Sequence, residues 1–199
     1  NPRLCISPIK KNCEKYFLSN NQFFTDLKKD FILINDKLAL KFSSLENEKD
    51  LLENNIFKNT DIDASRFIDE YLKQEEKDEL LLVKLIHEIR KEKKFDRLKI
   101  IIRPHPSVDI DKYKSYFEEI LDQSLNYSII RDGNVIDWMN KSKITFHNNC
   151  TTAIEGYFNG LENIFNYSEK LREGTSLEFK NIIKPFGIKN SILKAKHFI

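Results

Sequence analysis

The chain has 199 residues, enough for one α/β domain with a short flanking segment but too few for two complete domains of that kind. Hydrophobic residues make up 40% of the chain, which can therefore form a hydrophobic core, and 33 basic and 31 acidic side chains leave a net charge of +2. This near balance argues against nucleic acid as a partner, because nucleic-acid binding favours a concentrated basic face.

Five short apolar runs rich in β-branched residues predict strands. The runs are continuous rather than alternating, which is typical of a parallel sheet covered on both faces. The predicted strands are residues 31–35, 98–102, 127–131, 143–147 and 162–166. Residues 1–30 fit the pattern less well, and we expect them to form a helix after Pro8 at a domain junction, with residues 31–199 as the domain itself.

Apolar residues spaced three and four apart predict helices between these strands. Residues 64–94 are expected to form two helices, broken near the charged run 74–79, and residues 41–63 are expected to form a long polar loop. Further helices are predicted at 111–123, 135–141 and 151–159. The alternation of strands and helices predicts right-handed crossovers and a Rossmann-like, doubly wound, mainly parallel α/β sheet.

The first candidate site follows the second predicted strand, at Arg103-Pro104-His105-Pro106. Ligands of open α/β sheets bind beyond the carboxyl ends of the strands, where this segment and Asn35 are expected. Each proline restricts the residue before it, so Arg103 and His105 are expected in a stiff loop. Arginine could hold a phosphate and histidine could act as donor or general acid, whereas a rigid turn with an exposed histidine is the alternative.

The second candidate site follows the fourth predicted strand. Asn148, Asn149 and Cys150 are expected to form a turn, after which Thr151 and Thr152 open a helix. Main-chain N–H groups, the positive end of the helix and two hydroxyls are together suited to an anion. Simple N-capping is the alternative, although capping alone does not account for two Asn, one Cys and two Thr in one turn.

Two weaker candidates accompany these sites. Glu155 lies one helical turn beyond Thr151, where it could contact a ribose diol or only complement the helix N-terminus, and both interpretations carry equal weight. Gly133 allows a tight turn after the third strand, which would leave main-chain groups near Val135 and Ile136 free for a nucleobase edge.

Metal and thiol chemistry receive less support. The four His residues are dispersed, without the spacing of a zinc site, so neither a metal nor a cofactor is predicted. Cys150 at a helix start could have a lowered pKa, which keeps a hydrolase using Cys150 and His147 as an alternative. Three Cys without a C-x-x-C pair, no long apolar run and no visible signal peptide favour a reducing, cytoplasmic setting. Because the chain starts at Asn1, we expect a fragment of a longer protein.

Five segments carry a combined pattern. They are NPRL at 1–4, DFILIN at 30–35, RPHPSVD at 103–109, IRDGNVIDWM at 130–139 and HNNCTTAIEGYFNG at 147–160. Together they resemble the bacterial surface carbohydrate biosynthesis family, which looks related to the Kdo and sialic acid transferases with a GT-B fold. The resemblance extends from Asn1 to about Tyr167, and the combination of RPHP with HNNCTT carries most of its specificity.

The resemblance implies the C-terminal, donor-binding half of a glycosyltransferase of bacterial surface polysaccharide biosynthesis, as in capsule or lipopolysaccharide. It implies a nucleotide sugar, with a CMP-sugar as one option, held between two Rossmann-like domains. His105 and Pro106 would then contact the donor phosphate, and Thr151 and Thr152 would form a phosphate-binding turn. The implied reaction is inverting and uses a carboxylate base from the N-terminal domain, so this chain alone is expected to be inactive.

The implied partners are the nucleotide-sugar donor and a glycan or lipid-linked acceptor, and such an acceptor would suit peripheral association with the inner membrane. Three other functions stay open on the same architecture: a nucleotide-sugar epimerase, a glycerophosphotransferase-like enzyme and a non-catalytic assembly module of the same pathway.

Overall fold

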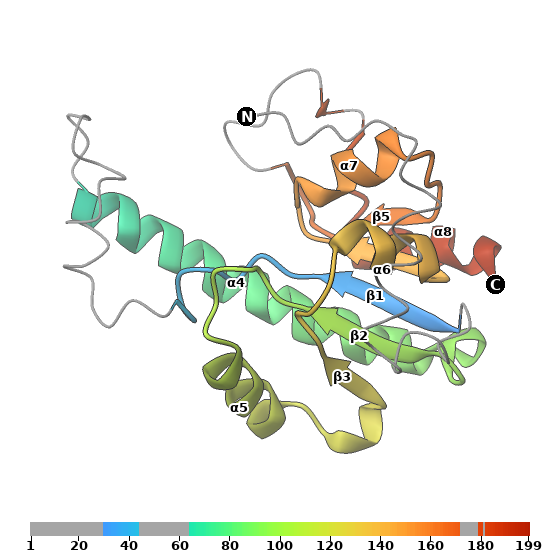
Figure 1. Ribbon diagram of the computed structural model, residues 1–199, viewed down its shortest axis with the longest axis horizontal. Coiled ribbons are helices and arrows are strands. Elements are labelled where there is room, and N and C mark those ends of the chain that lie inside the picture. Colours follow the sequence, from blue (N-terminus) through green and yellow to red (C-terminus); the bar gives the residue numbers. More distant parts are fainter. Residues whose placement is uncertain (1–29, 44–63, 172–178, 181) are drawn as a thin grey trace.

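The computed structural model describes residues 30–43, 64–171, 179–180 and 182–199. These residues form an α/β domain around a five-stranded parallel sheet with the spatial order β3-β2-β1-β4-β5 (Figure 1). The strands are β1 (Phe31–Asn35), β2 (Lys99–Arg103), β3 (Tyr127–Ile129), β4 (Ile144–His147) and β5 (Ile164–Asn166). All five predicted strands are present, so the prediction of a Rossmann-like, doubly wound sheet is confirmed.

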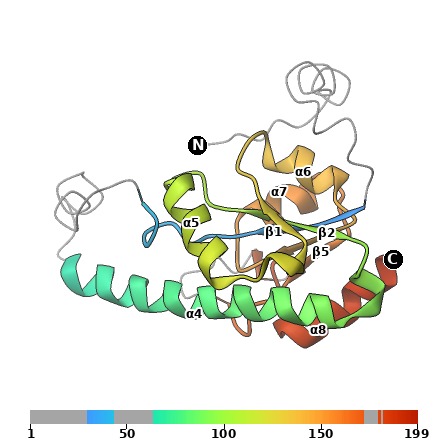
Figure 2. The same ribbon diagram turned by 90° about the horizontal axis from the view of Figure 1, so that it is seen from below.

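Helices cover both faces of the sheet (Figure 2). On one face lie α4 (Ala64–Lys91), α5 (Ile110–Ile120) and α8 (Gly187–Ala195), and on the other lie α6 (Val135–Lys141) and α7 (Thr152–Phe158). Short 3₁₀ turns are η1 (Lys93–Phe95), η2 (Gln123–Leu125) and η4 (Lys196–Phe198). Every helix among the described residues is too short or too polar to span a lipid bilayer.

The alternation of side chains along the strands divides the core into two layers. Ile32 and Ile34 of β1 pack with α4, α5 and α8, whereas Phe31 and Leu33 face α6. Trp138 of α6 is 1% exposed and packs edge-on against Phe31, with ring centroids 5.8 Å apart. A continuous apolar strand is therefore required here, because both faces of β1 are covered.

The prediction of two helices over residues 64–94 is wrong, because α4 is a single helix of 28 residues. The charged run expected to break it carries Glu75, Asp78 and Glu79, all of which are buried. Their carboxylates bind the segment that follows β1, where Lys37 lies 3.2 Å from Asp78 and Lys41 pairs with Glu79. A buried carboxylate needs such partners, and with them the helix continues.

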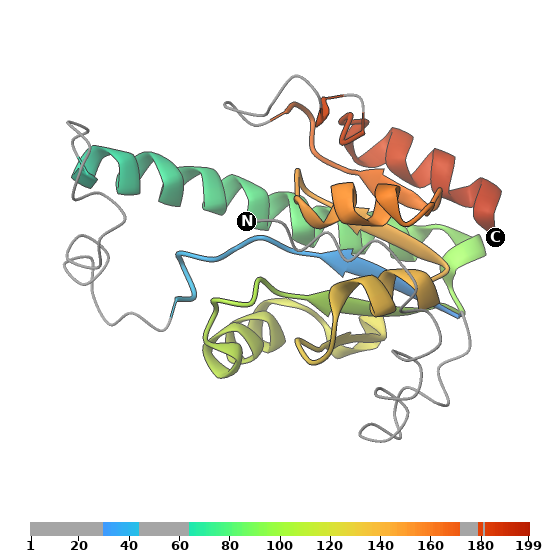
Figure 3. The ribbon, with the colours of Figure 1, turned by 45° about the horizontal axis from the view of Figure 1, so that its top comes forward.

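The remaining predictions divide by where they fall. Helices α5, α6 and α7 lie close to their predicted ranges, whereas α8 was not predicted. The predicted helix within residues 1–30 and most of the predicted loop 41–63 lie outside the described residues. The first half of α4 extends beyond the carboxyl ends of the strands, so this helix borders the edge where a ligand is expected (Figure 3).

Candidate functional site

Three polar side chains form a row across the carboxyl edge of the sheet. Asn35 ends β1 and is in register with Arg103 of β2 on one side and with His147 of β4 on the other. Register partners in a parallel sheet point to the same face, which here is the face covered by α6 and α7. The row therefore gathers the ends of three strands that are separated by long stretches of sequence.

The middle of this row is the topological switch point. From β1 the chain proceeds outward through β2 and β3, and it then returns to the other side of β1 to form β4 and β5. The crossovers on the two sides of the β1–β4 boundary run along opposite faces, which opens a crevice at the carboxyl ends of these strands. Asn35 and His147 stand at this boundary, where a ligand of a doubly wound sheet is expected.

The turn after β4 closes over Asn35. The Nδ2 atom of Asn35 lies 3.4 Å from Oγ1 of Thr152, and the same hydroxyl lies 3.0 Å from Sγ of Cys150. Thr152 is the first residue of α7, whose N-cap Thr151 makes no side-chain capping bond. The structure thus brings together Asn35, Cys150 and Thr152 from the predicted set.

Four buried side-chain atoms beside this turn have no hydrogen-bond partner among the described residues. They are Oδ1 of Asn35, both amide atoms of Asn148 and the hydroxyl of Tyr167. The three residues are 3%, 1% and 0% exposed, so bulk solvent does not reach them. Buried polar groups are almost always paired, so unpaired ones in a native fold mark a strained position or one that holds a water, an ion or a ligand.

The charges around these atoms make the position unsuited to an anion. Asp36, which follows Asn35, is buried, and burial raises its pKa to about 6 although the Tyr113 hydroxyl donates to it over 2.6 Å. Burial and the nearby Asp36 carboxylate also raise the pKa of Tyr167. The neighbouring cation Lys37 is paired with Asp78. An uncharged group with both donors and acceptors, such as a sugar hydroxyl, would fit better.

Asn149 has a structural task. Its φ of 49° is left-handed, and its Oδ1 accepts from Nδ2 of Asn166 over 2.8 Å and from Oγ of Ser168 over 3.1 Å. Its N–H donates to Asn166 as well, and the N–H of Cys150 donates to Nδ1 of His147. Two main-chain N–H groups expected to face an anion are therefore already used to fasten this turn to β4 and β5.

The chemistry of Cys150 and His147 argues against the thiol hydrolase. Burial raises the pKa of Cys150, and it lowers the pKa of His147 to about 3, with nearby Lys37 acting in the same direction. A nucleophilic thiolate requires a lowered pKa and a base that accepts from the thiol, whereas Nδ1 of His147 accepts from the main chain.

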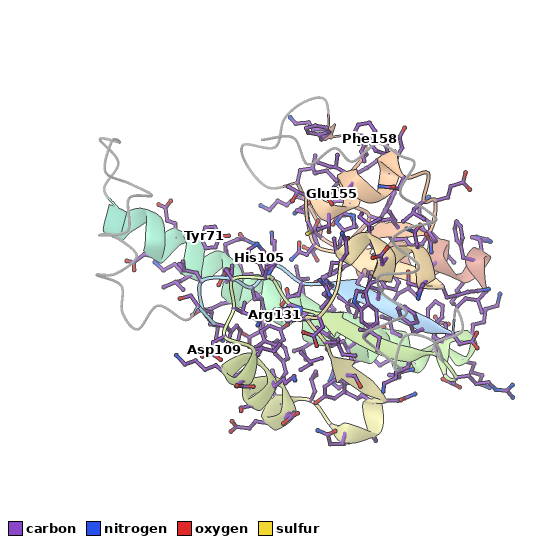
Figure 4. The ribbon with its side chains drawn as sticks, in the orientation of Figure 1. Tyr71, His105, Asp109, Arg131, Glu155 and Phe158 are labelled. Atoms are coloured by element: carbon purple, nitrogen blue, oxygen red, sulfur yellow. The ribbon has the colours of Figure 1, made fainter. Side chains whose placement is uncertain are left out.

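His105 stands in the loop after β2, on the carboxyl side of the sheet (Figure 4). Its Nδ1 accepts from the main-chain N–H of Ser107 over 3.3 Å and lies 2.8 Å from the hydroxyl of the same residue. In the neutral ring this arrangement puts the proton on Nε2, which is then a donor. Burial lowers the pKa of His105, with a smaller opposing contribution from Glu75, so the neutral form dominates at pH 7.

Arg103 is turned inward. Its terminal nitrogens donate to the carbonyl of Asp132 over 2.7 Å and to that of Gly133, in the turn between β3 and α6. Burial lowers the pKa of Arg103 to about 10, which leaves it charged at neutral pH. The Arg103 side chain thus stabilises the turn between β3 and α6. Gly133 has a positive φ of 80° there, which agrees with the tight turn predicted at this glycine.

The expected free main-chain groups after Gly133 are only partly present. Asn134 caps α6, and its Oδ1 accepts from the N–H of Ile136 over 2.8 Å, so that donor is occupied. Val135 is half-buried and packs against the core layer of α6. The prediction that the main-chain N–H of Ile136 is free is therefore wrong, because the Asn134 cap occupies this donor at the start of the helix.

The other predicted site residues are exposed. Pro106, Thr151 and Glu155 face solvent, with Glu155 on α7 well away from the loop of His105 (Figure 4). Sequence reasoning missed Asp36 and Tyr167, although each directly follows a predicted strand. Their position directly after a strand could have marked both residues as candidates, because ligands of open α/β sheets bind beyond the carboxyl ends of the strands.

Among residues 30–43, 64–171 and the described part of the C-terminal segment, no cluster of three His, Cys, Asp or Glu could hold a metal ion. No family model matches the chain, and no curated protein matches it. The fold and the site geometry are therefore the observations from which a function is argued.

Proposed function

We propose that this chain is the donor-binding domain of a glycosyltransferase and binds a nucleotide sugar at the carboxyl edge of its sheet. One observation carries the proposal: Asn35, Asn148 and Tyr167, which end β1 or directly follow β4 and β5, have buried amide and hydroxyl groups without a hydrogen-bond partner among the described residues. An α/β sheet of this order binds ligands at its switch point, and these groups suit an uncharged, hydroxyl-rich ligand.

The groups divide the site by chemistry. Sugar hydroxyls would pair with Asn35 and Asn148, since Lys37, the neighbouring cation among the described residues, is already paired with Asp78. The phosphate would lie nearer His105, whose Nε2–H has no acceptor among the residues that the structure describes. Arg103 would act through the turn at Asp132 and Gly133, since its terminal nitrogens already bind the carbonyls there.

The proposed reaction is inverting transfer in the intact protein. A base from outside this chain takes the proton of an acceptor hydroxyl, whose oxygen forms a bond to the anomeric carbon. The bond from that carbon to the phosphate oxygen breaks, and the electron pair leaves with the nucleotide phosphate. His105 would donate a hydrogen bond to this oxygen and so stabilise the charge that develops on it.

The direct test is an NMR titration of the chain with CMP-, UDP- and GDP-sugars, with inorganic phosphate as the control. We expect one nucleotide sugar to shift the amides of Asn35, His105 and Asn148, and phosphate alone to leave Asn35 and Asn148 unmoved. Shifts confined to residues 182–199 would contradict the proposal. Product analysis with the intact protein would separate a transferase from an epimerase or a glycerophosphotransferase.

A further inference from the structure

Glu75, in α4, is the central contact of the segment that follows β1. It is 2% exposed, and its carboxylate accepts from three successive main-chain N–H groups. Oε1 accepts from Ala39 over 2.8 Å and from Leu40 over 3.0 Å, and Oε2 accepts from Leu40 over 3.1 Å and from Lys41 over 2.8 Å. Hydrogen bonds to a charged acceptor are about twice as strong as neutral ones, so this carboxylate fixes the turn.

The segment held by Glu75 contacts the loop of His105 through its next residues. The carbonyl of Phe42 accepts from the N–H of Asp109 over 2.6 Å, and Ser43 forms an antiparallel bridge with Val108. The N–H of Val108 donates to the carbonyl of His105 over 3.2 Å. A continuous set of main-chain contacts therefore connects the segment clamped by Glu75 to the loop that carries the imidazole.

Aromatic packing holds the same segment against α5. The ring of Phe42 lies 5.0 Å from that of Tyr113, 5.2 Å from that of Tyr116 and 6.0 Å from that of Phe117, measured between centroids. The segment is thus held by α4 on one side and by α5 on the other. Movement of the Glu75 carboxylate would be transmitted to the His105 loop rather than absorbed.

Glu75 also acts on His105 electrostatically. The Glu75 carboxylate favours the protonated imidazole and so opposes the lowering of its pKa by burial. Three cations of this region already have partners: Lys37 pairs with Asp78, Lys41 pairs with Glu79, and Arg131 donates to the carbonyl of Val108. Of the carboxylates, Asp36 accepts from Tyr113, and Asp109 caps α5. Among the described residues, Glu75 is the charged side chain that raises the pKa of His105.

We propose that Glu75 is a positioning residue for His105: through the clamped segment 39–43 it sets the pose of the loop, and through its charge it sets the electrostatic environment of the imidazole. That this matters for donor chemistry rests on the proposed function. The connection between the two residues does not, and it can be measured without any donor.

The experiment is an NMR pH titration of the His105 imidazole in the full chain, in wild type, Glu75→Gln and Glu76→Gln. Glu76 is the matched control, because it is a neighbour in α4 that is exposed to solvent. We expect the titration midpoint of His105 to fall in Glu75→Gln and to stay in place in Glu76→Gln. An unchanged midpoint in a folded Glu75→Gln protein would overturn the proposal.

Two further measurements cover a Glu75→Gln variant that fails to fold. Glu75→Asp keeps the charge but shortens the side chain, so the amides of Ala39, Leu40 and Lys41 should exchange with deuterium faster while the midpoint moves less. In wild type these three amides should be protected, and fast exchange there would also refute the clamp. A nucleotide sugar that binds while the midpoint is insensitive to Glu75 refutes this inference alone, whereas a shifted midpoint without donor binding refutes only the proposed function.

Discussion

Replacement of Asn148 by leucine should stabilise the unliganded protein and abolish the binding of a nucleotide sugar. Asn148 is 1% exposed, and neither of its amide atoms has a partner among the described residues. A buried, unpartnered polar group costs about 1–3 kcal/mol, which gives roughly 2–6 kcal/mol for the two atoms. Leucine has a similar branched shape but is bulkier, and overpacking costs about 1–3 kcal/mol. The middles of these two ranges differ by about 2 kcal/mol, which is the expected net gain in the free energy of unfolding.

Asn166 provides a matched control of opposite sign. It is also 1% exposed, but its amide is fully engaged. Its Nδ2 donates to Oδ1 of Asn149 over 2.8 Å and to the carbonyl of Ile183 over 2.6 Å, and its Oδ1 accepts from the N–H and hydroxyl of Ser168. Asn166→Leu should therefore lower the free energy of unfolding by about 3–5 kcal/mol, since several buried partners lose their bonds.

Urea denaturation of both variants and wild type, with and without the nucleotide sugar, measures these differences. Wild type should gain stability from the ligand, whereas Asn148→Leu should be more stable than wild type alone and gain nothing from the ligand. If Asn148→Leu is destabilised as strongly as Asn166→Leu, then the Asn148 amide is satisfied within the fold and the reasoning behind the site is refuted.

Three further predictions concern the fold. Gly156→Ala should lower the free energy of unfolding, measured by thermal denaturation, by about 1–3 kcal/mol. The reason is that its new Cβ would lie 2.4 Å from Cδ1 of Ile164 and 2.5 Å from Cε of Met139. Full wild-type stability would contradict this packing. Arg90→Lys should lower the free energy of unfolding, measured by urea denaturation, by about 2–4 kcal/mol. The guanidinium donates to four main-chain carbonyls, and an ammonium group cannot reach all four together. A loss below about 1 kcal/mol would contradict this prediction. Burial lowers the pKa of His147 to about 3, so the unfolded chain takes up a proton near pH 6.5 that the folded chain does not, and this contribution to stability is lost as pH falls. The stability difference between wild type and His147→Asn should therefore shift against wild type by about 2 kcal/mol between pH 7.5 and 5, and a pH-independent difference would refute it.

The five strands could be predicted because their signal is local. Each is a short apolar run such as Ile100–Ile102, and a strand buried on both faces needs no information beyond its own residues. The carboxyl ends of β1 and β4 were also predictable, and with them the positions of Asn35 and His147. Arg103, expected in the loop after the second strand, is instead the last residue of β2. The alternation of strands and helices was enough to indicate the doubly wound class.

The continuity of α4 could not be predicted, because it depends on distant partners. The run at 74–79 reads as a break when taken alone, yet Glu75 is satisfied by the N–H groups of residues 39–41, which lie 34 to 36 positions earlier. The inward turn of Arg103 has the same origin, since its partners at Asp132 and Gly133 come from another crossover.

The sequence by itself therefore determined the strands, their parallel class and the edge at which polar residues collect, because these follow from side-chain patterns within single segments. Only the tertiary structure decided the strand order β3-β2-β1-β4-β5, which puts the switch point between Asn35 and His147. It alone decided which amides stay unpartnered, since Asn148 and Asn166 are the same residue type with the same burial and differ only in what the fold puts beside them. Hydrogen bonding between side chains is set by distances across the fold, and those distances are not written in any one segment.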